Sequence, residues 1–329
     1  MDNVIIVVND EPYSIWDVNI AERNQEYLQG IDVDHFQYLN ETYQKSDDKK
    51  RSSIALRGSL HHATEALFSL IGALLQAPTA VYAWMPKCSN SDLRSIVKRI
   101  NDKDSTLFVR YSFTPLSWRA ISEVVFQWYL PGTDKQKKTT ELFAELWQRM
   151  SYEFEDQNHI NEYNSIKHGF RIKSGGFALA IGAEKEYGVA PPASEMQLIG
   201  KSDHGTSFFV LKEVGNIKGN RSFTSRRVSL NWKYEKVALL LQLVSMSINN
   251  VTSALKCING AEVGQCKFTR PVEDADFSNP WTHSPGVTSC NLDVVIDESA
   301  VPKTGRKELL EKVKKYQTEL KIKHTGGDF

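Results

Sequence analysis

The sequence lacks the segments that direct a chain into a membrane or out of the cell. Its opening residues, MDNVIIVVND, carry Asp2 where a secretory signal peptide has positive charge, and the apolar run that follows is short. The longest apolar stretch, residues 66–77, is interrupted by Ser69, Gly72 and Gln76. It is shorter than the roughly 18 apolar residues of a membrane span. We therefore expect a cytoplasmic protein with no membrane association.

The residue patterns of common cofactor sites are also missing. The four cysteines are scattered, and no two have the spacing of a zinc knuckle: Cys88, Cys257, Cys266 and Cys290. Free thiols are the ordinary state of such cysteines in a reducing compartment. The chain has no glycine-rich phosphate loop and no serine nucleophile elbow. We expect no bound cofactor.

An excess of charge of either sign is absent as well, since 40 basic and 40 acidic side chains give a net charge of zero. A protein that coats nucleic acid is normally strongly basic, so any contact with RNA must be local. With 41% apolar and 24% charged residues, the composition is that of a globular protein. The 329 residues are enough for one large domain or two ordinary ones.

Helical periodicity dominates the chain and gives way once to strand periodicity. Apolar residues recur at helical spacing in segments 15–28, 33–43, 52–77, 91–100, 116–130, 139–168, 234–256 and 307–321. The period changes to two in three runs: Phe177, Leu179 and Ile181; Phe209 and Leu211; and Val228, Leu230 and Trp232. We expect each run to form the buried face of a strand. We predict an α+β fold, mainly an α-helical bundle, with a three-stranded antiparallel β-sheet insertion at about 170–232 inside a domain of residues 1–256. A loop-rich extension, 257–329, ends in an amphipathic helix.

The helix that ends at Pro78 is the predicted centre of the fold. One face is apolar over its whole length: Leu56, Leu60, Ala63, Leu67, Leu70 and Leu74. Its N-terminal half carries Arg57, His61, His62 and Glu65. Arg57, His61 and Glu65 follow one another at steps of four and therefore share one edge of the helix. Such a cluster is either a hydrogen-bonded network at the rim of the core, with Glu65 neutralising Arg57 or a histidine, or a functional site.

A second polar stretch, NEYNSIKHGFR at 161–171, precedes the change from helix to sheet. Asn164, Lys167 and His168 lie within about one helical turn of each other. Lys and His at a helix end are favoured by the helix dipole alone, so this group has a structural as well as a functional interpretation.

This stretch resembles the closing helix of HEPN domains, small helical bundles found in bacterial toxins, abortive-infection proteins and CRISPR-associated ribonucleases. The family motif places an arginine a few residues before a histidine, and His168 matches the histidine. The resemblance implies metal-independent cleavage of RNA in a bacterial defence or toxin context, usually across a homodimer. The arginine is absent, because Asn161, Glu162 and Tyr163 occupy its positions.

Three functions follow as alternatives. In the first, Arg57 supplies the missing cation and His61 or His62 acts with His168 as an acid–base pair in a ribonuclease. In the second, the protein binds RNA or another protein without catalysis, and the β insertion is the contact surface. In the third, a metal is held between helices by histidines and carboxylates, drawn from His61 and Glu65 on one helix and Glu155, His159 and Glu162 on another.

Overall fold

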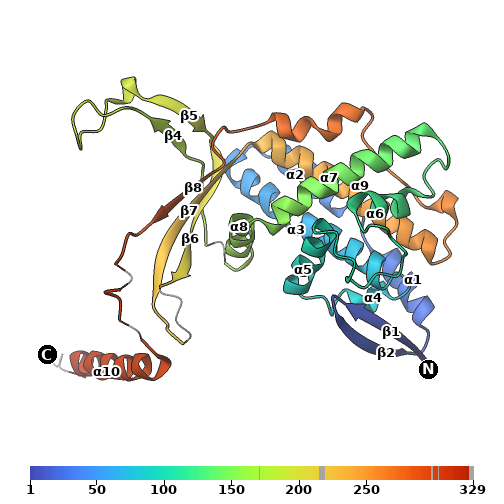
Figure 1. The fold of residues 1–329 in the computed structure, drawn as a ribbon, viewed down its shortest axis with the longest axis horizontal. Coiled ribbons are helices and arrows are strands. Elements are labelled where there is room, and N and C mark those ends of the chain that lie inside the picture. The colour runs from blue at the N-terminus through green and yellow to red at the C-terminus, as the bar shows by residue number, and fades with distance from the viewer. Residues whose placement is uncertain (170, 215–218, 298, 303, 326–329) are drawn as a thin grey trace.

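Helices predominate in the computed structural model, which describes residues 1–169, 171–214, 219–297, 299–302 and 304–325, and the side chains up to residue 317. About 51% of the chain is helical and 16% lies in strands, so the predicted α+β class is confirmed. Figure 1 shows a body of packed helices and, beside it, an arm of strands, which comprises the strands within residues 173–232 and the strand at 289–293.

The helical body contains α1 (Ile20–Gly30), α2 (His35–Gln44), α3 (Lys49–Gln76), α4 (Val81–Trp84), α5 (Asn90–Asn101), α6 (Trp118–Phe126), α7 (Asp134–Glu155), α8 (Gln157–Lys167) and α9 (Tyr234–Ile258). Side-chain caps fix several of the starts. Asp48 accepts a hydrogen bond from the backbone of Arg51 at the start of α3, and Asp156 caps α8 through two backbone N–H groups. The cap at Asp156 also separates α7 from α8, which sequence periodicity predicts as one interrupted segment.

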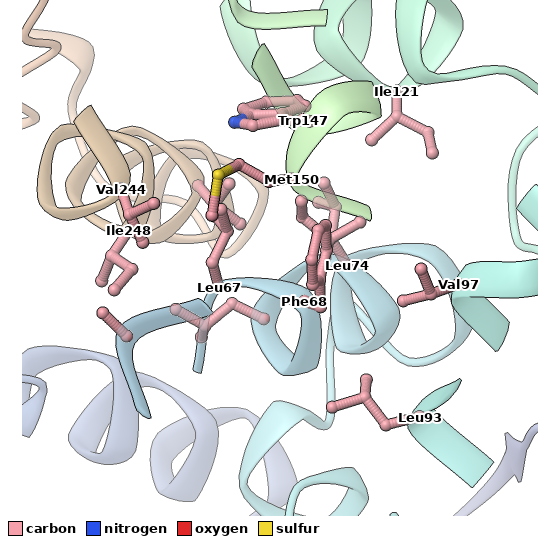
Figure 2. Packing of buried hydrophobic residues seen from close by; sticks show 14 of the residues in the cluster. Leu67, Phe68, Leu74, Leu93, Val97, Ile121, Trp147, Met150, Val244 and Ile248 are labelled. Atoms are coloured by element: carbon pink, nitrogen blue, oxygen red, sulfur yellow. The ribbon is translucent and has the colours of Figure 1, made fainter. Parts of the chain in front are cut away.

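The hydrophobic core is built around α3 and α9, which pack along each other (Figure 2). All six residues of the predicted apolar face of α3 are at most 3% exposed, so that prediction is confirmed. Figure 2 shows Leu67 and Phe68 of α3 facing Met150 of α7 and Val244 of α9. Each buried side chain of this size contributes about 1.5–3 kcal/mol.

Helix α9 is long and apolar enough to cross a bilayer, by length and composition alone. Its most apolar window is 78% buried within the protein. Burial of this kind is typical of a core helix, which is apolar because other helices surround it.

The strands form separate small sheets rather than the single three-stranded sheet that the sequence predicts. Among the described residues, β1 (Asp2–Val8) pairs with β2 (Glu11–Asp17), and β4 (Ala178–Ile181) pairs with β5 (Gln197–Lys201). The third sheet has the order β3-β6-β7-β8, with β3 (Lys173–Ser174), β6 (His204–Glu213), β7 (Phe223–Trp232) and β8 (Ser289–Asp293). The predicted number of strands was wrong because 177–181 pairs locally with β5, while β8 comes from the predicted loop-rich extension.

The large sheet has two unlike faces. Its inner face packs on the helical body through Phe208, Val228 and Leu230, each at most 3% exposed. The register pairs Phe208 with Val228 and Phe209 with Arg227, so Phe209 lies on the opposite side. We call that side the outer face, and its exposed members include Phe209, Leu211, Phe223, Arg227 and Leu292, together with the polar residues Lys173, Glu213 and Ser225.

This register corrects the prediction that Phe209 and Leu211 are buried. Four consecutive apolar residues, 208–211, fit either alternation, and only the pairing with β7 decides which pair faces the core. Phe209 and Leu211 are 71% and 72% exposed, and Ile181 of the first predicted run is 57% exposed on β4.

The N-terminus also differs from the helix that the sequence predicts at residues 15–28. Residues 11–17 continue as β2, because β1 pairs with it through a turn at Asn9, whose φ is +56°. Asn19 caps α1 by accepting a hydrogen bond from the Glu22 backbone. The last helix, α10 (Arg306–Thr325), follows the arm and lies apart from the helical body in Figure 1.

Candidate functional site

The two polar stretches singled out by sequence converge where α3, α8 and β6 meet. Glu162 of α8 is fully buried, and its Oε2 accepts from Arg57 Nε and Nη2, both at 2.9 Å. His61 Nε2 lies 3.0 Å from the same oxygen. The hydroxyl of Thr206 on β6 donates to Oε1 at 2.6 Å. One carboxylate therefore ties two helices and a strand together.

Each member of this cluster is placed by ordinary helix and strand geometry. Arg57 and His61 are four residues apart on α3 and reach the same neighbour. The guanidinium of Arg57 also lies over the ring of Trp232 at 5.1 Å, which adds a cation–π contact at the end of β7. The arrangement satisfies a buried charge with hydrogen bonds on both carboxylate oxygens.

Burial and mutual attraction set the protonation states here. Burial opposes the charge on Glu162, but Arg57 and His61 outweigh it and hold the pKa of Glu162 well below its usual range. Burial, together with the charge of Arg57, lowers the pKa of His61 to about 4, although Glu162 acts in the other direction. At neutral pH, His61 is an uncharged imidazole that donates its Nε2 proton to Glu162.

A second ion pair lies near Arg57. Lys236 of α9 reaches Glu153 of α7 at 3.1 Å, and this attraction, against the effect of burial, lowers the pKa of Glu153. His159 has its Nδ1 at 3.1 Å from the carbonyl oxygen of Glu153. Burial, reinforced by Arg57, lowers the pKa of His159 as well.

These groups border a cavity of about 450 Å³. Its walls come from the C-terminal end of α7, the start of α8, the junction of β7 with α9, and the segment 281–289. Arg57, Glu153, His159 and Lys236 line one side, and Trp232 and Trp281 contribute aromatic surface. The volume is within the range of small-molecule sites.

The remaining sequence-predicted residues lie near this cluster but make other contacts. Glu65 contacts Lys167 at 3.7 Å and accepts from Asn90, so it does not neutralise Arg57 as the structural interpretation had it. His62 packs edge-on against Phe36, with a ring separation of 5.3 Å. The Asn164 carbonyl accepts the backbone N–H of His168, whose side chain is exposed at the end of α8.

Sequence reasoning assigned Glu162 only to the metal alternative and missed its role as the counter-charge of Arg57. Glu155, another ligand of the metal alternative, accepts a hydrogen bond from Asn101 Nδ2 at 2.5 Å. Within the described residues, no group of three or more His, Cys, Asp or Glu side chains is placed to hold a metal ion. His159 and Glu162 are three residues apart, a spacing that places both on one face of a helix. This spacing does not show which residue either of them contacts.

Comparisons of the chain with protein-family models, with curated proteins and with solved structures found no match.

Proposed function

We propose that the protein is a non-catalytic RNA-binding protein whose contact surface is the outer face of the arm. The observation that carries the proposal is the exposure of Phe209 and Phe223, at 71% and 53%, on the same face of β6 and β7. Aromatic rings exposed on an antiparallel sheet are a common platform on which the bases of single-stranded RNA stack.

The charges around these rings favour RNA over an apolar protein segment. Arg227 is directly opposite Phe209 in the register and is exposed. Lys173, opposite Ser207, adds positive charge to the outer face, and Glu213, opposite Phe223, adds a negative one. Lys212 and Arg226 lie on the inner side, where Arg226 is neutralised by Asp293. A cation beside an exposed ring contacts the phosphate of the nucleotide whose base stacks there. The contact is local, as the net charge of zero requires.

The helix that follows the arm extends this basic character. Helix α10 is rich in lysine and arginine, including Arg306, Lys307 and Lys315. Figure 1 shows it at the end of the arm away from the helical body. An RNA strand that crosses the outer face can then also contact the lysines and arginines of α10.

Catalysis has less support than binding from the same geometry. The ribonuclease interpretation uses Arg57 as the free cation, but its guanidinium is held by Glu162. A general acid or base works best with a pKa near the working pH, whereas that of His61 is about 4. Ribonuclease activity is therefore the competing outcome of the test rather than the proposal.

The test measures binding of a fluorescein-labelled single-stranded RNA of about 16 nucleotides by anisotropy, over a range of salt concentrations. We expect Phe209→Ala and Phe223→Ala each to weaken binding by about 5- to 150-fold, the loss of one stacked base at about 1–3 kcal/mol. The matched control is Tyr38→Ala, because Tyr38 is 66% exposed on α2, outside the arm.

Two results would count against the proposal. The first is no RNA binding by the wild type, which would leave a protein partner as the occupant of the outer face. The second is cleavage of the RNA by the wild type but not by His168→Ala, which would establish the ribonuclease interpretation instead.

A further inference from the structure

The segment that follows α9 folds back along the last turns of that helix. The carbonyl of Lys267 accepts a hydrogen bond from Asn249 Nδ2 at 2.7 Å and another from the hydroxyl of Ser253 at 2.9 Å. Two residues further along the chain, the backbone N–H of Thr269 donates to the side chain of Asn250 at 2.7 Å. The segment therefore runs antiparallel to α9, with its lower-numbered residues toward the C-terminal end of the helix.

This course of the chain brings two cysteines together. Ser253 and Cys257 are four residues apart, so they share one edge of α9 at consecutive turns. Since Ser253 holds the carbonyl of Lys267, the residue before it, Cys266, lies beside the next turn, which carries Cys257. The two side chains are in contact, because the thiol of Cys257 donates a hydrogen bond to the sulfur of Cys266. Both residues are partly exposed and both thiols are free.

The other two cysteines are placed differently. Cys88, between α4 and α5, donates its thiol hydrogen to the carbonyl of Ser89 at 3.6 Å. Cys290 lies on β8 of the arm. Both are as partly exposed as the pair at the end of α9. Within the part of the chain that the structure describes, Cys257 and Cys266 are the cysteines that have each other as a hydrogen-bond partner.

The hydrogen bond gives the two thiols different roles. Burial raises the pKa of Cys257 to about 12, and the hydrogen bond to Cys266 acts in the same direction. A thiol that keeps its proton is a poor nucleophile, so Cys257 is not the first of the pair to react. Cys266, which accepts the hydrogen bond, is the attacking thiol, and Cys257 is the thiol that resolves the product.

We propose that Cys257 and Cys266 form a reversible disulfide by exchange with a small disulfide of the glutathione class. The thiolate of Cys266 attacks one sulfur of oxidised glutathione, which forms a mixed disulfide and releases one glutathione. Cys257 then loses its proton and attacks the sulfur of Cys266, which releases the second glutathione. The protein pair loses two electrons, oxidised glutathione gains them, and the two thiol protons end on the two glutathione molecules. The inference does not depend on RNA binding by the arm.

The cross-link would close the loop 258–265 at a junction of the helical body. Asn259 in this loop accepts a hydrogen bond from Asn24 of α1 at 2.9 Å and donates one to the carbonyl of Pro78 at 2.9 Å. These contacts join the end of α9 to α1 and to the segment that follows α3. Oxidation would fix this junction covalently, and reduction would return it to hydrogen bonds alone.

The test treats the folded full chain with oxidised glutathione, blocks the remaining thiols with N-ethylmaleimide and maps the cysteines by mass spectrometry of an unreduced digest. We expect a peptide cross-linked between Cys257 and Cys266. Cys88 and Cys290 should be recovered blocked or as glutathione adducts. Because thiols in contact react at a high effective concentration, the cross-link should exceed the glutathione adduct of Cys266 by about tenfold. Dithiothreitol should restore both thiols.

Cys257→Ser is the matched variant, because it removes the resolving thiol and replaces it with a hydroxyl of similar size. We expect Cys266 to accumulate in this variant as the mixed disulfide with glutathione. Cys88→Ser is the control and should form the cross-link as the wild type does. Circular dichroism checks that both variants fold.

The wild-type map by itself can overturn the proposal. The proposal fails if the folded wild type forms no cross-link between Cys257 and Cys266, whether Cys266 carries glutathione or stays free. Cross-links spread evenly over all pairs of the four cysteines would count against it in the same way.

Discussion

Arg57 and Glu162 lie 105 residues apart and form a buried ion pair, with Arg57 Nη2 at 2.9 Å from Glu162 Oε2. Their side chains are 7% and 0% exposed. The pair joins the central helix α3 to α8, the last helix before the arm. Either partner alone would be a buried charge without compensation, so the two positions depend on each other.

Removal of the Glu162 charge should destabilise the protein strongly. In Glu162→Gln, the Arg57 guanidinium stays buried without a counter-charge, and we expect the free energy of unfolding to fall by about 3–5 kcal/mol. Urea denaturation followed by circular dichroism measures this change. Glu123→Gln is the control, since Glu123 is 57% exposed in a surface pair with Arg119 and should contribute less than about 1 kcal/mol.

A double variant separates the loss of the pair from the cost of an unpaired charge. Arg57→Met combined with Glu162→Met removes both charges, and we expect it to be more stable than Glu162→Gln. If the double variant were the less stable of the two, hydrogen bonding to His61 and Thr206 would matter more than charge compensation.

Acid should destabilise the fold through His61. Its folded-state pKa of about 4 is below the ordinary 6.5, so the unfolded chain binds more protons between these values and stability falls as the pH falls through this window. The depressed pKa of Glu162 acts in the same direction below its ordinary value of 4.5, where the unfolded carboxylate becomes protonated first.

We expect His61 to account for about 2 kcal/mol of lost stability between about pH 7 and about pH 5. The measurement is urea unfolding at a series of pH values for the wild type and for His61→Gln, which keeps a donor toward Glu162 but does not titrate. The variant should show a flatter profile. Parallel profiles would mean that His61 keeps an ordinary pKa in the folded protein.

Two glycines of α3 should respond in opposite ways to alanine. A Cβ at Gly72 would lie 2.6 Å from Cη2 of Trp84, whose ring is fully buried, so Gly72→Ala should cost about 1–3 kcal/mol by overpacking. A Cβ at Gly58 would meet Ile166 at an ordinary 3.4 Å. Gly58→Ala should stabilise the helix by up to about 1 kcal/mol. Thermal unfolding of the pair provides the comparison, and equal melting temperatures would contradict the packing at Trp84.

Ser247 should be costly to replace because it satisfies a buried indole. Its hydroxyl accepts from Trp147 Nε1 at 3.0 Å, and both side chains are fully buried. Ser247→Ala should lower the free energy of unfolding by about 1–3 kcal/mol. Ser59→Ala on α3 is the control; no partner of the Ser59 hydroxyl is seen among the described residues, so we expect a change within about 0.5 kcal/mol. A similar loss in both variants would show that the indole contact adds nothing.

The sequence predicted local features of this fold well and long-range ones poorly. The apolar face of α3 follows from its own periodicity. The stretches around Arg57 and Lys167 meet through the contacts of Glu162 and Glu65, which periodicity alone does not predict. The identity of the partner of Arg57 does not follow, because two inward-facing carboxylates, Glu65 and Glu162, were available. Only the angle at which α8 crosses α3 selects the second.

The same limit explains the errors in the arm. A strand has no intrinsic inner face, so the side on which Phe209 lies is decided by β7 and by the helices beneath it. The indole N–H of Trp232, which is buried and has no hydrogen-bond partner among the described residues, is likewise invisible in the sequence, since this depends on what surrounds the ring after folding.

The pairing of β8 with β7 has a consequence for the order in which the chain is completed. Synthesis proceeds from the N-terminus, so α9 emerges before β8 does. Until residues 289–293 leave the ribosome, the edge of β7 from Arg226 to Leu230 has no strand beside it. A message truncated between these two elements would therefore yield a chain with an open edge on β7, which makes β8 a guard against self-association of nascent molecules.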